Sequence, residues 1–161
     1  APLRGAKSQL YEGGIREPML VRWPGKVQPG STCEEPVASI DFLPTFHRAA
    51  NVAGLDDQPV DGVDLTPLLT GEGSLERETL YWHYPLDKPH FLGGRSAGAI
   101  RHGEWKLLRF YDDGHEELYN LAEDVGETKN LADEKPEIAA QLRAMHRNWL
   151  KEVGTATQEA G

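Results

Sequence analysis

The segment between residues 79 and 121 constrains the fold most, because it holds four short runs of strand-forming residues separated by turn residues. The runs span residues 79–84, 96–101, 105–111 and 116–121. Gly103 supplies one turn, and Asp113-Gly114 is typical of a tight hairpin. These runs predict a small antiparallel sheet in which the strands follow one another as a meander.

A helix is predicted over residues 136–153, after the last strand. Its apolar residues recur every three or four positions and therefore share one face: Ile138, Leu142, Met145 and Trp149. Pro136 suits the first helical position, and Gly154 suits the end of the helix. We expect this helix to cover one face of the sheet.

The first half of the chain has a different character. Residues 1–16 are rich in glycine and basic residues. Residues 18–23 form a short apolar run bounded by prolines, which predicts a strand buried on both faces. Residues 39–52 predict a helix with Leu43 and Phe46 on one face.

Residues 54–78 contain many glycines and prolines and are predicted as loops. We place a boundary near Glu72, which gives two predicted domains, residues 1–72 and residues 73–161. The second domain would hold the antiparallel sheet and the last helix.

Composition limits the possible partners. The chain has 161 residues, of which 39% are hydrophobic and 27% charged, as in globular domains. Its formal net charge of -9 argues against nucleic acid, because phosphate binding needs a positive surface. The longest apolar runs fall far short of the about 20 residues of a membrane helix, so no membrane is expected. The single cysteine, Cys33, permits no intrachain disulfide.

Lys7 is the first candidate site residue. It lies among small residues and close in sequence to Gly13-Gly14, where the backbone can approach another group closely. A lysine held among glycines is a reasonable ligand for sulfate, phosphate or carboxylate. The alternative is a solvated basic loop, since most lysines lie on protein surfaces.

Three further candidates lie in a stretch rich in aromatic residues and glycines: His83, His90 and Arg95. Together with the aromatic residues they could form the wall of a pocket for a sugar or aryl group. The alternative for either histidine is a place within an aromatic core cluster. The sequence contains no metal-ligand motif and no Gly-x-Ser-x-Gly nucleophile motif, so we assign no metal ligand to this chain.

Several motifs in the same order resemble those of sulfatases. Residues 7–18 follow the pattern Lys-x3-Tyr-Glu-Gly-Gly-x-Arg-x-Pro, and residues 41–45 the pattern Asp-x-x-Pro-Thr. Residues 61–65 resemble the family's Asp-Gly-x-Asp-Leu segment. Residues 100–107 and 117–132 are similar to the family's C-terminal sheet. The resemblance covers nearly the whole chain.

The resemblance implies an alkaline-phosphatase-like fold, of class α/β to α+β. The chain would be its C-terminal third. Residues 1–72 would be the end of the large α/β domain, and residues 73–161 the smaller domain with a four-stranded antiparallel sheet and a helix. Helix 39–52 and strand 18–23 would then expose apolar surface, from which we expect dimerisation, strand swapping or disorder within residues 1–72.

The resemblance also implies an activity. Sulfatases hydrolyse sulfate esters with a formylglycine made from Cys or Ser and with a bound Ca²⁺, whose ligands lie upstream in the family. Only Lys7 maps onto that centre, as a contact of the sulfate, while His83, His90 and Arg95 fall where such enzymes shape the substrate pocket. We therefore expect a parent enzyme acting on sulfated glycans or aryl sulfates, with this chain inactive alone. Family analogy places it in the periplasm or outside the cell.

Two other functions stay open from the sequence. The chain could be a standalone module that binds sulfated or acidic glycans through Lys7, His83, His90 and Arg95. It could also belong to a phosphoesterase of the alkaline-phosphatase superfamily, although the Tyr-Glu-Gly-Gly pattern argues against this.

Overall fold

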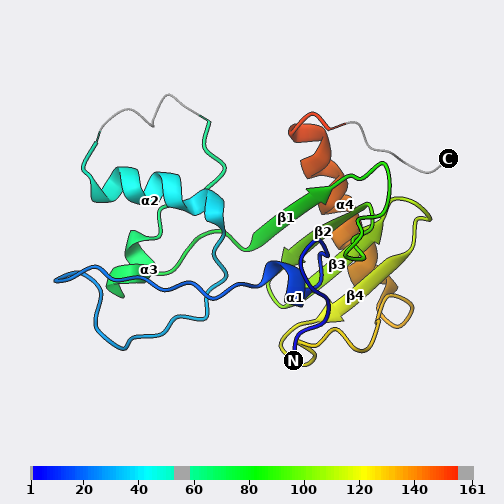
Figure 1. Ribbon diagram of the computed structural model, residues 1–161, viewed down its shortest axis with the longest axis horizontal. Helices are drawn as coiled ribbons and strands as arrows, with labels where there is room; N and C mark the ends of the chain where they lie inside the picture. The colour runs from blue at the N-terminus through cyan, green and yellow to red at the C-terminus, as the bar shows by residue number, and fades with distance from the viewer. Residues whose placement is uncertain (1, 53–58, 156–161) are drawn as a thin grey trace. The chain divides into compact units, whose positions relative to one another are not determined.

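The computed structural model describes residues 2–52 and 59–155 (Figure 1). The chain divides into two compact units. The first, here called the sheet unit, combines Ala1–Pro18 with Thr79–Gly161; the second, the small unit, is Met19–Glu78. No helix among the described residues is long and apolar enough to cross a membrane.

The sheet unit is built on four antiparallel strands in the order β1-β2-β3-β4, which confirms the predicted meander (Figure 1). The strands are β1 (Thr79–Tyr84), β2 (Ala97–His102), β3 (Trp105–Phe110) and β4 (Glu116–Asn120). Tyr81 pairs with Ile100, Ile100 with Leu107, and Leu107 with Leu118, so these four side chains form one row across the sheet.

Helix α4 (Pro136–Glu152) covers the face that carries this row, as expected. Ala139 and Leu142 are buried against the row, and Ile138 and Met145 pack beside them. The Tyr81 ring stacks on Trp149, with centroids 4.9 Å apart and an angle of 8° between the planes. The apolar stripe predicted from the sequence is therefore the contact between α4 and the sheet.

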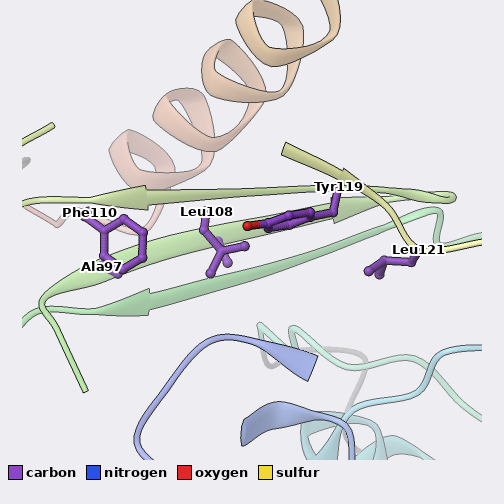
Figure 2. Close-up of a cluster of buried hydrophobic side chains, with 6 residues drawn as sticks. Ala97, Leu108, Phe110, Tyr119 and Leu121 are labelled. Atoms are coloured by element: carbon purple, nitrogen blue, oxygen red, sulfur yellow. The ribbon is translucent and has the colours of Figure 1, made fainter. Parts of the chain in front are cut away.

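The other face of the sheet holds a second apolar cluster. Figure 2 shows its side chains on the side away from α4. The buried members are Ala97, Ala99, Leu108, Phe110, Tyr119 and Leu121. Leu10 and Tyr11 of the first segment pack against them, together with Trp82. Residues 2–18, which include the short helix α1 (Glu12–Ile15), thus cover this face.

A buried charge network joins the first segment to the sheet. Lys106 on β3 is fully buried, and its Nζ lies 2.8 Å from Oε1 of Glu12 and 2.8 Å from Oε1 of Glu127. The backbone N–H of Glu12 donates to Oε2 of Glu127 at 2.7 Å. Burial raises the pKa of Glu127, and the neighbouring Lys106 opposes that rise. One ammonium therefore serves two carboxylates from two distant parts of the chain.

A second polar cluster lies on the same face of the sheet. Oε2 of Glu117 accepts hydrogen bonds from the hydroxyls of Tyr11 at 2.8 Å and Tyr119 at 2.7 Å. Arg4 donates to the Tyr119 hydroxyl at 2.7 Å and to the backbone carbonyl of Glu127 at 2.9 Å. The guanidinium also lies 4.0 Å from the centroid of the Tyr11 ring. The first segment is thus tied to the sheet at both Arg4 and Glu12.

The small unit contains η1 (Ser39–Asp41), α2 (Phe42–Ala49) and α3 (Thr66–Thr70). The first two confirm the helix predicted from residue 39, whereas α3 lies in a region predicted as loops, of which residues 54–58 fall outside the described residues. Pro67 near the start of α3 is compatible with its first turn, which explains why proline density alone was misleading.

Asp41 holds the small unit together. Its carboxylate is fully buried and accepts two hydrogen bonds from Arg77, at 2.6 and 2.7 Å. The backbone N–H groups of Ala38 and Val63 also donate to it, at 2.8 and 3.0 Å. The Thr45 hydroxyl accepts from the backbone N–H of Leu65 at 2.9 Å. The Asp-x-x-Pro-Thr pattern therefore links α2 to the chain around residues 63–65.

The strand predicted over residues 18–23 is wrong. This segment is not a strand, and Leu20 is 96% exposed. A strand buried on both faces needs paired neighbours, and the described residues provide none for it. Leu43 and Phe46 of α2 are also exposed, at 57% and 66%, as expected for this helix. Dimerisation of this surface stays a prediction.

The compact units also differ from the predicted domains of residues 1–72 and 73–161. Residues 2–18 pack on the sheet, because Leu10, Tyr11 and Glu12 bury their side chains there. The predicted domains concern a longer parent protein and stay a prediction.

Replacing Lys106 with Met should destabilise the sheet unit strongly. The change leaves Glu127 buried without a cation among the described residues, and it leaves Glu12 only the exposed Arg16, whose Nη1 lies 3.8 Å from Oε2 of Glu12. Breaking a buried pair costs about 3–5 kcal/mol. Urea unfolding measures this loss. Lys129→Met is the matched control, because the Lys129 amine pairs with Glu134 at 2.8 Å where both side chains are exposed. The control should cost less than about 1 kcal/mol. Equal losses in the two variants would contradict the network's role.

The small unit should lose stability in acid. Burial alone would raise the pKa of Asp41, but hydrogen bonds from Arg77 and from the backbone hold it below the usual 3.8. A lowered folded-state pKa gives stability that is present above the unfolded-state value and lost as the pH falls through the folded-state value. The stability difference between wild type and Asp41→Asn, followed by urea unfolding of small-unit amide signals, should shrink below about pH 4. A difference that stays constant down to pH 2 would contradict it.

Candidate functional site

Lys7 lies in a tight turn over residues 6–9, where the backbone N–H of Gln9 donates to the carbonyl of Ala6 at 3.1 Å. Ser8 has a φ of 72°, in the left-handed region that favours glycine. This backbone costs a non-glycine residue roughly 1–3 kcal/mol. Lys7 is exposed, and among the described residues its amine has no hydrogen bond or ion pair. The turn therefore presents an unpaired cation from a strained backbone.

Gly13 and Gly14 support this turn from within the first segment. A Cβ atom on Gly14 would lie closer than 3.0 Å to the carbonyl oxygens of Gln9 and Ala6, and one on Gly13 equally close to that of Arg4. The sequence predicted a close backbone approach at these glycines. The structure shows that the approaching groups are the chain's own carbonyls.

The loop between β1 and β2, residues 85–96, contacts the Lys7 turn from the other side. Nε2 of Gln9 donates to the carbonyl of Leu92 at 3.2 Å. A Cβ atom on Gly94 would lie closer than 3.0 Å to the carbonyl oxygen of Ser8. The Ser8 hydroxyl is buried there and has no hydrogen-bond partner among the described residues. The turn is thus enclosed by backbone on two sides.

His90 organises this loop. Its backbone N–H donates to the carbonyl of Gly94 at 2.7 Å, and its own carbonyl accepts from Gly93 at 2.8 Å. Its Nδ1 accepts from the backbone N–H of Leu92 at 3.2 Å. The neighbouring Phe91 ring is 88% exposed, with its centroid 4.5 Å from that of His90. A half-buried imidazole and an exposed aromatic ring therefore stand in the loop that contacts the Lys7 turn.

Arg95 lies at the end of the same loop, but its charge is already matched. Its guanidinium donates to both carboxylate oxygens of Asp112, at 3.0 and 2.6 Å, and to Asp113 at 2.8 Å. The hydrogen bonds with these carboxylates raise the pKa of the Arg95 guanidinium, and the bond with Asp112 has the largest effect. The guanidinium also lies 4.3 Å from the centroid of the Phe110 ring. A substrate would have to share Arg95 with two carboxylates.

A small open pocket of about 220 Å³ lies between the first segment, the β1–β2 loop and the sheet. Its lining is mostly apolar, and Gln9 and Arg95 supply the polar side chains. The remaining lining residues are Leu10, Tyr11, Gly93, Ala97, Leu108 and Phe110. The pocket adjoins the Lys7 turn through Gln9.

His83 lies on the opposite face of the sheet from these groups. It pairs with Gly98 in the row next to that of Tyr81 and Ile100, on the face that α4 covers. Its Nδ1 shares a hydrogen bond with the Tyr111 hydroxyl at 2.9 Å, and burial lowers its pKa. The structure therefore brings together the Lys7 turn and the loop of His90 and Arg95, but not His83. Binding of substrate by these four residues stays a prediction.

The sequence did not identify the residues that hold the candidate site in place. Glu12, Lys106 and Glu127 form the buried charge network, and Ser8 and Gly94 make the close contact at the turn. The first three lie inside the segments that resemble the sulfatase family, residues 7–18, 100–107 and 117–132. Their place in these segments was the available sign that they have a role. Among the described residues, no group of three or more His, Cys, Asp or Glu side chains could hold a metal ion.

Comparison with known proteins places these features in a family. The family described as "N-sulphoglucosamine sulphohydrolase, C-terminal" matches residues 6–154. Arylsulfatase A of Bos taurus is 37% identical over 86% of this chain, and a sulfatase of Formosa agariphila is 34% identical over 93%. The solved structure of BT4656 in complex with its substrate D-glucosamine-2-N,6-O-disulfate superposes with a TM-score of 0.72, at 26% identity over 87% of this chain.

The chain spans about 30% of the length of these two relatives and 29% of the BT4656 chain. The matching part includes the turn with Lys7, the four-stranded sheet and α4. The sheet with its covering helix and the relatives together confirm the predicted fold. The chain therefore belongs to the sulfatase family, and it corresponds to that family's C-terminal region.

Proposed function

We propose that this chain contributes the sulfate-contacting lysine and part of the substrate pocket to a sulfuric ester hydrolase. The carrying observation is Lys7, an exposed ammonium with no partner among the described residues, held on a turn enclosed by backbone on two sides. An ammonium beside a sulfate ester stabilises the charge that develops on the sulfate and on the leaving oxygen. A fixed turn lets it do so without reorganisation.

The nucleophile and metal implied by the family do not fit the described residues, which hold no cluster suited to a cation. Cys33 is exposed and lies in the small unit. It has no basic neighbour in the sequence that would activate its thiol as a nucleophile. The formylglycine and the Ca²⁺ ligands would therefore come from other parts of a longer parent protein. In this proposal the 161-residue chain alone is inactive.

A sulfated glycan is the proposed substrate class. BT4656 acts on a sulfated glucosamine and shares the fold of this chain at 26% identity. In this chain, His90 can donate to a sugar hydroxyl or sulfate, and the exposed Phe91 ring offers a flat apolar surface for a sugar ring. We also propose, by analogy with the family, that the parent works in the periplasm or outside the cell.

Measurements on the natural protein test this proposed function. The protein is captured with an antibody raised to this chain, its intact mass is measured, and sulfate release is assayed with an aryl sulfate and with a sulfated glucosamine. We expect a mass far above 17.9 kDa and turnover of at least one substrate. A native mass near 17.9 kDa with binding of sulfated oligosaccharides but no hydrolysis would instead establish a glycan-binding module.

Lys7→Ala in the natural protein should lower kcat by about 10²–10³-fold, the usual effect of removing one group that stabilises transition-state charge. Lys151→Ala is the matched control, because Lys151 is an exposed lysine on α4 and should leave kcat unchanged. The purified 161-residue chain should release no sulfate. Activity of Lys7→Ala equal to that of Lys151→Ala would refute the assigned role.

A further inference from the structure

The Lys7 turn depends on a contact with a distant part of the chain. Ser8 keeps a φ of 72° although it is not glycine, and its buried hydroxyl gains no hydrogen bond among the described residues. Neither feature is favourable by itself, so the surrounding structure must impose this backbone. The group that meets the carbonyl of Ser8 is the backbone of Gly94, which lies 86 positions further along the chain (94 minus 8).

We propose that Gly94 is a positioning residue for Lys7. Its lack of a side chain lets the β1–β2 loop close over the Ser8 carbonyl, and this contact fixes the direction in which the turn presents the amine. The inference rests on the proposed function in assigning the sulfate to Lys7. It adds that the β1–β2 loop, which carries His90 and Phe91, sets the place of the sulfate-binding group as well as lining the pocket.

Three observations support the proposal independently of any ligand. A Cβ on Gly94 has no room, since it would lie closer than 3.0 Å to the Ser8 carbonyl oxygen. The loop is itself fixed, because the carbonyl of Gly94 accepts from the backbone N–H of His90 at 2.7 Å. The hydrogen bond from Gln9 to the Leu92 carbonyl, at 3.2 Å, gives the loop a second contact with the same turn.

The movement of the Lys7 turn is also restricted on the side that faces away from the β1–β2 loop. Gly14 allows the carbonyls of Ala6 and Gln9 to approach its backbone, so the turn cannot retreat in that direction. A methyl group on Gly94 would therefore displace residues 6–9 rather than be absorbed by them. A shift of about 1 Å at a group that binds the reacting centre can reduce a rate by about 10²-fold.

The test uses Gly94→Ala in the natural protein, with Gly62→Ala as the matched control. Gly62 makes the same kind of contact in the small unit, where a Cβ would lie closer than 3.0 Å to the carbonyl oxygen of Ile40. Both variants should lower the unfolding temperature by similar amounts. We expect Gly94→Ala to lower kcat/KM for a sulfate ester by about 10- to 100-fold and Gly62→Ala to leave it within about twofold.

A double-mutant cycle separates positioning from general destabilisation. If Gly94 acts through Lys7, Gly94→Ala should change kcat/KM by less than about twofold in a Lys7→Ala background. Ser8→Gly should keep full activity, because glycine adopts the same φ and retains the carbonyl that meets Gly94. Additive losses in the cycle, or an equal loss in Gly62→Ala, would overturn the proposal.

Amide hydrogen exchange tests the contact without reference to activity. The Gln9 amide donates to the Ala6 carbonyl. Its hydrogen should exchange faster in Gly94→Ala than in the wild type, whereas its exchange rate in Gly62→Ala should equal that of the wild type. Unchanged exchange at Gln9 in Gly94→Ala would overturn the positioning role. If the wild-type protein hydrolyses no sulfate ester, the proposed function fails, whereas the exchange result still decides whether Gly94 fixes the turn.

Discussion

One buried ammonium holds the sheet unit in the form that the candidate site requires. Lys106 lies on the sheet's second face and pairs with Glu12 and Glu127, which are 94 and 21 positions away in the sequence (106 minus 12; 127 minus 106). A buried charge without a partner is far more costly than an exposed one, so removing Lys106 would penalise both carboxylates. Glu12 immediately precedes the glycines that support the Lys7 turn, and the network therefore fixes the base from which that turn extends.

The same face shows how motif residues of different kinds cooperate. Charge pairs hold Glu12 on the sheet, and Gly13 and Gly14 let the turn fold back on its own backbone. Gly94 brings the β1–β2 loop against that turn. The residues Tyr11-Glu12-Gly13-Gly14 thus mainly build the turn and attach it to the sheet. The Lys7 ammonium has no hydrogen bond or ion pair among the described residues, and in the proposed function it contacts the sulfate. In the small unit, Asp41 has the role that the Lys106 network has in the sheet unit. Its buried carboxylate accepts hydrogen bonds from Arg77 and from two backbone N–H groups.

Local sequence patterns predicted the sheet and α4 well, because alternation and helical periodicity are properties of neighbouring residues. They could not predict what lies on the second face of the sheet, since the contacts of Lys106 with Glu12 and of Gly94 with Ser8 each join residues more than 80 positions apart. The strand predicted over residues 18–23 was wrong for a related reason. An apolar run indicates burial, but whether it becomes a strand depends on neighbouring strands from other parts of the sequence. His83 looked equivalent to His90 in sequence, yet strand alternation places it on the face covered by α4.

The most direct test is the crystal structure of the natural protein with a sulfate ester or an unreactive analogue bound. We expect Nζ of Lys7 to lie about 2.7–3.2 Å from a sulfate oxygen. Ser8 should keep its left-handed backbone against Gly94, and the contacts of Lys106 with Glu12 and Glu127 should be unchanged. A bound ester whose sulfate lies away from Lys7, with the turn in the same conformation, would contradict the role of Lys7 as the sulfate-contacting residue.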